Sequence, residues 1–120
     1  MKLHKEEDVL VTAGGSTTTG GFHVPPRYNA IEFTTQLLAG SDPYDVEVQA
    51  LEVYPNAAEM YGGPSTLSQA QETDWITIMG AVGISLDHDF PTQPNSYGYY
   101  RVTISSAGDS TVRLFSIGIA

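Results

Sequence analysis

The C-terminal part of the chain alternates apolar and polar residues with a period of two, in the runs 98–105 and 111–119. Both runs are rich in Val, Ile, Thr, Tyr and Phe, the residue types that fit a half-buried pleated strand. The apolar faces comprise Tyr100, Val102 and Ile104 in the first run and Phe115, Ile117 and Ile119 in the second. Because small, turn-forming residues separate the two runs, the pattern predicts a β-hairpin that closes a larger β-fold.

The same alternation predicts earlier strands at 27–38, 45–54, 74–79 and 81–86. In the second of these the apolar parity changes, and a one-residue bulge near Ala50 would restore a single inward face. In the third, apolar residues occupy both parities, so we expect this strand to be covered on both faces. The interval 55–73 carries no strand period and predicts a long loop, a kind of segment that is often functional.

These strands define the fold class. We expect seven or eight closely spaced strands and no amphipathic helix, which predicts an all-β fold. The architecture that suits this pattern is an antiparallel β-sandwich of jelly-roll-like or immunoglobulin-like form. It would occupy residues 27–120 as one domain.

Residues 1–26 differ from the rest. A charged start leads into the short apolar run 9–11, and a Gly/Thr/Ser tract at 12–21 follows that can bury little surface. Pro25-Pro26 then imposes an extended entry into the first confident strand. The segment predicts an extended N-terminal arm or linker, flexible or docked on a partner. The alternative is an edge strand at 9–12 followed by a long loop, and the sequence leaves both open.

The charge balance restricts the class of partner. Fourteen Asp and Glu residues against five Lys and Arg give a net charge of −9, and residues 29–99 contain ten carboxylates and no Lys or Arg. Phosphate binding and attraction to anionic membranes need clustered cations, so neither nucleic acid nor membrane is an expected partner. The chain has no cysteine, no membrane-length apolar run and no signal-peptide pattern at its start. We therefore expect a protein that is made in a cytoplasm and stays there or is assembled into something larger.

One short acidic cluster could bind metal. Asp87 and Asp89 flank His88 and could share a calcium ion with backbone carbonyls or with Asp42 and Asp45. A recognisable calcium loop would also need a run of alternating Asp or Asn, a glycine and a distal glutamate. The plainer interpretation is a polar strand end that begins a turn, so we expect no cofactor.

No catalytic constellation stands out. The chain lacks the G-x-S-x-G elbow of serine hydrolases, and none of its three histidines occupies a position typical of a catalytic base. With fourteen acids, a pair of neighbouring carboxylates would occur by chance and carries no specificity. We expect a non-enzymatic protein.

Aromatic residues give a better case for binding. Tyrosines fall in loops and at strand ends, and a ring with a polar tip suits an interface or the face of a sugar. The candidate partner-binding residues are Val9, Leu10, Val11, Phe22, Tyr61, Tyr97 and Tyr99. Arg101 and Arg113 lie among many acids, so we expect them to pair with carboxylates.

Three segments of the C-terminal part carry a family resemblance: WITIMG at 75–80, DHDFP at 87–91 and YYRVTISSAGDSTVRLFSIGI at 99–119. They resemble small β-sandwich accessory proteins of tailed-phage virions, over about 40% of the chain. This resemblance implies a capsid decoration, cement or head-fibre-type subunit of the virion. It also implies a homo-oligomer, with a trimer favoured, that binds the major capsid protein.

A carbohydrate-binding module of the same fold is the alternative. In that hypothesis Trp75 and the tyrosines form a stacking platform for a glycan, and Asp87 and Asp89 hold a structural calcium. A decoration subunit should be oligomeric and indifferent to sugars and chelators, whereas a glycan module should be monomeric and stabilised by calcium.

Overall fold

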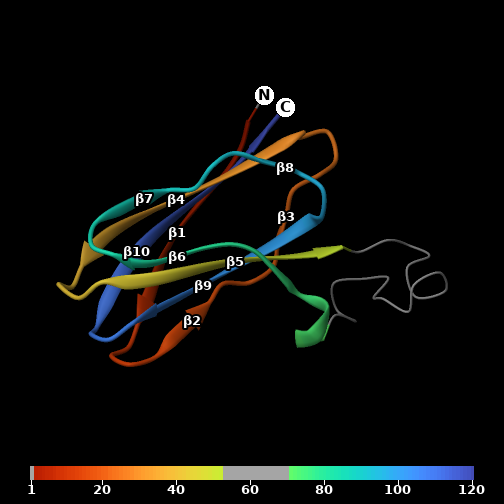
Figure 1. Ribbon diagram of the computed structural model, residues 1–120. Coiled ribbons are helices and arrows are strands. Elements are labelled where there is room, and N and C mark those ends of the chain that lie inside the picture. Colours follow the sequence, from red (N-terminus) through yellow and green to blue (C-terminus); the bar gives the residue numbers. More distant parts are fainter. Residues whose placement is uncertain (1, 53–70) are drawn as a thin grey trace.

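The computed structural model describes residues 2–52 and 71–120 and shows two antiparallel sheets packed against each other (Figure 1). Within these ranges there are ten strands, where the sequence predicted seven or eight, and the predicted β-sandwich is confirmed. Most of the loop predicted at 55–73 lies outside the described residues. Its end, Glu72–Asp74, forms a turn of 3-10 helix. No helix in the described ranges is long and apolar enough to span a bilayer.

The first sheet has the strand order β1-β10-β4-β7, with β8 also paired to β4. Its strands are β1 (Lys2–Val11), β10 (Ser110–Ile119), β4 (Ala30–Ala39), β7 (Asp87–Asp89) and β8 (Gln93–Pro94). The second sheet has the order β2-β9-β5-β6, with β3 also paired to β9. Its strands are β2 (Ser16–Thr18), β9 (Gly98–Ser106), β5 (Tyr44–Glu52), β6 (Ile76–Ile84) and β3 (Phe22–His23). The long edge strands, β1 and β6, therefore lie on opposite sides of the sandwich.

The two C-terminal strands are present as predicted, but they do not form a hairpin. β9 belongs to the second sheet and β10 to the first, so the turn between them crosses from one sheet to the other. In consequence the inner face of β10 carries Val112, Leu114 and Ser116, which are buried. Phe115 and Ile117, predicted on the apolar face, are only half-buried on the outer face. A period of two identifies strands and not their pairing, and this is why the prediction was wrong.

The N-terminal segment also differs from the predicted arm. β1 pairs with β10 along its whole length, from Lys2 opposite Ile119 to Val11 opposite Ser110. The short strands β2 and β3 then pair with β9 in the other sheet. Gly14, with a φ of 74°, belongs to the turn in which the chain leaves β1 for β2. The alternative of an edge strand was nearer, although that strand begins at Lys2 and not at residue 9.

β5 is regular where a bulge was expected. It pairs with β9 from Tyr44 to Glu52 without a register shift. Its pairing with β6 has two irregularities, one between Tyr44 and Val46 and one between Val48 and Gln49. Ala50 and the adjacent Leu51 are both buried, so β5 is covered on both faces at this point.

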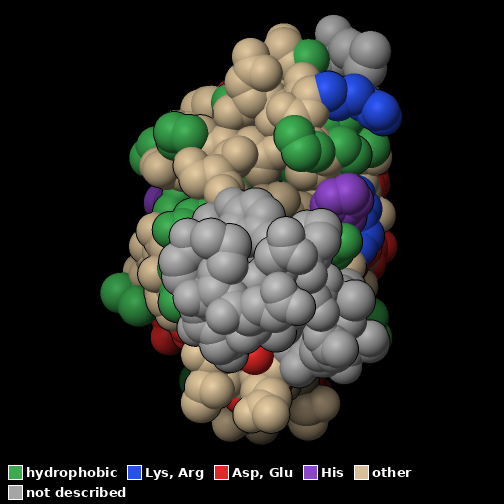
Figure 2. All heavy atoms as spheres, turned by 90° about the vertical axis from the view of Figure 1, so that its right-hand side faces the viewer, with side chains coloured by type: hydrophobic (Ala, Val, Ile, Leu, Met, Phe, Trp, Pro, Cys, Tyr) green, Lys and Arg blue, Asp and Glu red, His purple; other side chains and the backbone are tan. Residues whose placement is uncertain are grey.

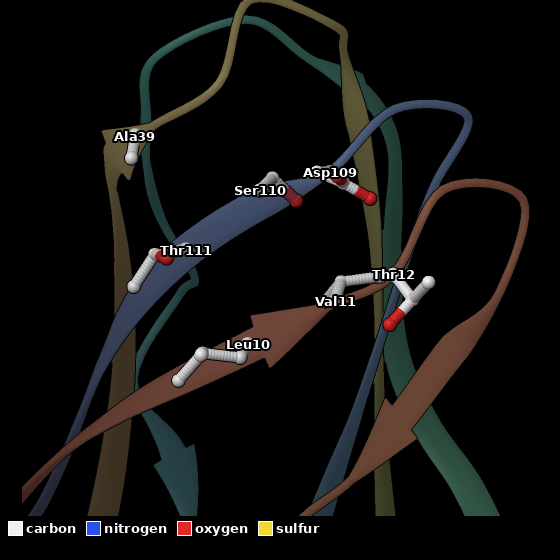
Figure 3. Close-up of a pocket in the computed structure, with 7 residues that line it drawn as sticks. All are labelled: Leu10, Val11, Thr12, Ala39, Asp109, Ser110 and Thr111. Atoms are coloured by element: carbon white, nitrogen blue, oxygen red, sulfur yellow. The ribbon is translucent and has the colours of Figure 1, made fainter.

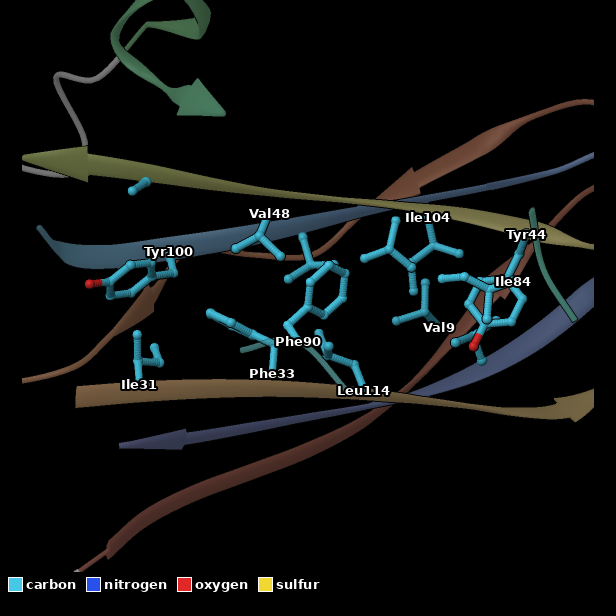
Figure 4. Close-up of a cluster of buried hydrophobic side chains, with 14 of the residues drawn as sticks. Val9, Ile31, Phe33, Tyr44, Val48, Ile84, Phe90, Tyr100, Ile104 and Leu114 are labelled. Carbon is cyan, nitrogen blue, oxygen red and sulfur yellow. The ribbon is translucent and has the colours of Figure 1, made fainter. Parts of the chain in front are cut away.

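The inner faces of the two sheets form one continuous core (Figure 4). Two buried tyrosines lie at its opposite ends. The Tyr44 hydroxyl donates a hydrogen bond to the Leu86 carbonyl at 2.8 Å and accepts one from the Thr35 hydroxyl at 2.9 Å. The Tyr100 hydroxyl donates to Asn95 Oδ1 at 2.7 Å. Burial raises the pKa of both phenols above 10.0, so both hydroxyls stay protonated as donors.

Candidate functional site

Exposed apolar side chains concentrate on the side of the sandwich that carries β6. The segment 76–86, here called the β6 strip, contains no charged residue. Three of its side chains are strongly exposed: Val82 at 83%, Leu86 at 69% and Ile76 at 45%. The prediction that 74–79 would be covered on both faces was therefore wrong. Sequence alternation could not show this, because an apolar edge residue and an apolar core residue have the same pattern.

Hydrogen-bonding groups on one edge of β6 have no strand partner within the described residues, where β6 pairs with β5 alone. A shallow groove of about 460 Å³ runs along its outer face. Two carboxylates line this groove, and both already accept hydrogen bonds. Asp45 accepts one from the Gly83 amide at 2.9 Å, and Glu47 accepts one from the Thr77 hydroxyl. Each of these carboxylates of β5 is thus joined by a hydrogen bond to β6.

The β1 side has the opposite character. Lys5 and Glu7 form an ion pair at 3.2 Å on the same parity as the buried Val9 and Val11, so charges lie on the core-facing side of this edge. On the outer face Arg113 bonds to Asp8 at 2.8 Å. This hydrogen bond lowers the pKa of Asp8 below 3.8.

The sequence candidates of the N-terminal run separate in the structure. Val9 and Val11 are buried in the core, each 3% exposed, so neither presents a surface to a partner. Leu10 lies between them on the opposite face and is 70% exposed. It lines a shallow pocket of about 360 Å³ with Thr111 and Ser110, where β1 ends beside the start of β10 (Figure 3).

The tyrosine candidates fall at the other end of the sandwich. Tyr97 and Tyr99 line a pocket of about 320 Å³ together with His23, here called the Tyr99 pocket. The rings of His23 and Tyr99 stack with their centroids 4.6 Å apart. Phe22 is half-buried, with the Lys5 ammonium 5.3 Å from the centre of its ring. Tyr61 lies outside the described residues.

The metal candidates do not gather into a site. Asp87 and Asp89 are both exposed on β7, opposite Gln36 and Thr34 of β4. In the ranges 2–52 and 71–120 no three His, Cys, Asp or Glu side chains are placed to hold one ion. The structure therefore offers no cluster around these two aspartates that resembles a calcium cage.

The two arginines pair with carboxylates as predicted. Arg101 makes two hydrogen bonds to Glu72, at 3.0 and 2.6 Å, and its guanidinium lies 4.5 Å from the centre of the Trp75 ring. The bonds from Arg101 lower the pKa of Glu72 below 4.5. Trp75 is accordingly engaged by a cation of its own chain.

Comparisons with known proteins identify the fold and no family. No family model matches the sequence, and no curated protein matches it either. A crystal structure of PirA aligns with a TM-score of 0.53 at 15% identity, covering 96% of this chain and 93% of that one. The Yersinia pseudotuberculosis-derived mitogen aligns with a TM-score of 0.52 at 8% identity, covering 100% and 88%. A subunit of Bacillus endospore appendage pili aligns at 0.44 and 11% identity, covering 100% and 92%.

At these identities the likeness concerns the β-sandwich alone. None of these three structures is a phage decoration protein, so they do not support the resemblance of residues 73–120 to that class.

Proposed function

We propose that this protein is a non-enzymatic structural subunit of the decoration or cement type. It would be made in the host cytoplasm and reside in a tailed-phage virion, where it would bind the major capsid protein and stabilise the shell. Copies of the chain would associate into a homo-oligomer, with a trimer favoured by the sequence resemblance.

The observation that carries this proposal is the β6 strip. An edge strand with no strand partner on one side within the described residues, with strongly exposed apolar side chains and no charge, is a template for association with another protein surface. The copies each carry a net charge of −9 and repel one another over most of their surface. The β6 strip is a long edge segment where two copies can meet without placing like charges in direct contact.

The acidic surface of the chain would make the contact with the capsid protein. Carboxylates are plentiful on the strands beside the β6 strip, among them Asp45, Asp87 and Asp89, all of which are exposed. Electrostatic complementarity favours a basic patch as the partner of such a surface and raises the rate of encounter. A capsid protein with a basic outer patch fits this requirement.

The first test is the solution mass by light scattering, with and without an excess of EDTA. We expect a mass of several times the 12.9 kDa chain, three times for a trimer, and no change with the chelator. Co-sedimentation with shells of a major capsid protein, in low and high salt, then tests the contact with the capsid protein. A monomer at all concentrations, or an oligomer that dissociates in EDTA, would contradict the proposal.

A further inference from the structure

A second surface lies at the end of the sandwich opposite Leu10 and apart from the β6 strip. The Tyr99 pocket is formed by β3, the segment that follows it and the turn before β9. Its lining residues are His23, Val24, Pro26, Asn95, Ser96, Tyr97, Gly98 and Tyr99. Figure 2 views the side of the molecule that carries β3 and β8, and it shows Lys or Arg and His side chains together along one margin.

The walls of this pocket are held by one half-buried amide, that of Asn95. Asn95 Nδ2 lies within hydrogen-bonding distance of three backbone carbonyls, those of Val24, Pro25 and Tyr28, at 3.1, 3.2 and 2.8 Å. Its Oδ1 accepts the hydrogen bond from the Tyr100 hydroxyl at 2.7 Å. Since Tyr100 is fully buried in the core, the amide ties both walls of the pocket to the rigid part of the sandwich. The pocket is therefore pre-formed, and little ordering is needed when a ligand enters.

Backbone geometry fixes the remaining wall. Gly98 has a φ of 90°, a conformation that favours glycine, and its carbonyl accepts a hydrogen bond from the Val24 amide at 2.7 Å. This bond joins the strand that carries His23 to the strand that carries Tyr99, and it brings the two rings into their stack.

Three side chains of the pocket wall can offer hydroxyl groups to a ligand. Those of Ser96, Tyr97 and Tyr99 make no hydrogen bond to another described residue. The His23 ring stacks on Tyr99, and its ring nitrogens add polar atoms to the lining. Among the described residues, no carboxylate, lysine or arginine lines the pocket. The pocket therefore combines aromatic rings with hydroxyl groups that can form hydrogen bonds.

We propose that the Tyr99 pocket binds one pyranose ring of a glycan. A sugar ring offers a C–H face to an aromatic ring and hydroxyls around its rim, and these requirements match the rings of Tyr97 and Tyr99 and the hydroxyls of Tyr97 and Ser96, which all line the pocket. A volume of about 320 Å³ suits a single ring with its substituents. A nucleotide is disfavoured because no cation lines the pocket. The pocket shares no lining residue with the β6 strip, so this binding does not depend on the structural role proposed above, and it replaces the expectation that such a subunit is indifferent to sugars.

The test is an array of immobilised neutral and acidic saccharides probed with the labelled protein, in the presence and absence of EDTA. The wild type is expected to bind at least one class of saccharide without calcium. Tyr99→Ala should lower the affinity about tenfold or more, because it removes the stacking face. Thr103→Ala is the matched control, since Thr103 lies on the same strand and face as Tyr99 but does not line the pocket.

Three results would overturn the inference. They are no saccharide bound by the wild type, undiminished binding by Tyr99→Ala, and competition for the pocket by a peptide while saccharides fail to compete. His23→Ala provides a second variant should Tyr99→Ala melt at a lower temperature than the wild type. A variant of the β6 strip such as Val82→Lys should bind saccharide normally, so failure of this inference and failure of the structural proposal are separate outcomes.

Discussion

The two long edge strands of this sandwich differ in whether they carry the charges that discourage pairing with another chain. β1 is a ten-residue edge that carries charges on both faces, with the Lys5–Glu7 ion pair toward the core and Arg113 bonded to Asp8 outside. β6 is an edge of nine residues that carries no charge, and Val82 on it is 83% exposed. Both edges present unpaired backbone groups within the described chain, yet only β1 carries the charges that discourage another strand.

This difference supports the β6 side, and not the β1 side, as the proposed surface of contact with other chains. Charges on an edge, especially inward-pointing ones, are the usual protection against unwanted strand pairing. The charges on β1 show that an edge strand of this fold can carry such protection. The lack of charge on β6 therefore suggests that this edge is covered by another chain in the assembly. We therefore propose that copies of the chain associate through the β6 strip, while β1 stays an exposed edge.

The largest expected effect is the loss of self-association when a charge is placed on the β6 strip. Val82→Lys adds a cation that would be buried against another copy, and the association constant should fall on the order of 100-fold. This variant is expected to fold, since the Val82 side chain is exposed. Analytical ultracentrifugation over a range of concentrations measures the change.

Leu10→Lys is the matched variant on the other side, since Leu10 is 70% exposed on β1. Its association should equal that of the wild type. The assignment of the two sides would be reversed if Leu10→Lys dissociated the oligomer and Val82→Lys did not.

A smaller effect is expected from the hydrogen bonds that tie each side to the fold. On the β6 side, Tyr44→Phe leaves the fully buried Thr35 hydroxyl without its acceptor and removes one bond to Leu86. It should lower the free energy of unfolding by about 1–3 kcal/mol. On the β1 side, Thr17→Val removes an exposed 2.6 Å bond to the Leu10 carbonyl, and should cost about 0.5–1 kcal/mol. Urea denaturation of both variants measures the two losses in the free energy of unfolding. Equal losses would show that these hydrogen bonds stabilise the two sides of the sandwich equally.

The strands themselves could be predicted because a half-buried strand shows its period in a single stretch of sequence. Ile31, Phe33 and Thr35 alternate with polar residues and are buried, as the pattern indicates. Pairing could not be predicted in the same way, since β9 and β10 satisfy one alternation whether they share a sheet or face each other across the core. The unpaired N-terminal arm was predicted from a polar Gly/Thr tract, whose backbone nevertheless supplies β2 to the second sheet.

The candidate surfaces were only partly predictable. Tyr97 and Tyr99 were identified from their position near strand ends, but nothing local indicated that His23 would stack on Tyr99 from a strand far away in sequence. Nothing in the sequence marked out Asn95, whose role depends on three backbone carbonyls that only the fold brings together. The absence of charge in 76–86 was visible in the sequence, whereas its exposure required knowing that β6 is an edge.

Hydrogen exchange of the wild-type amides at several protein concentrations would show directly whether copies meet at the β6 strip. We expect amides of β6 to exchange slowly in concentrated solution and faster on dilution, while those of β1 exchange at rates independent of concentration. Concentration-dependent protection of β1, or β6 amides that exchange equally at every concentration, would contradict the assignment of the β6 strip as the surface where copies meet.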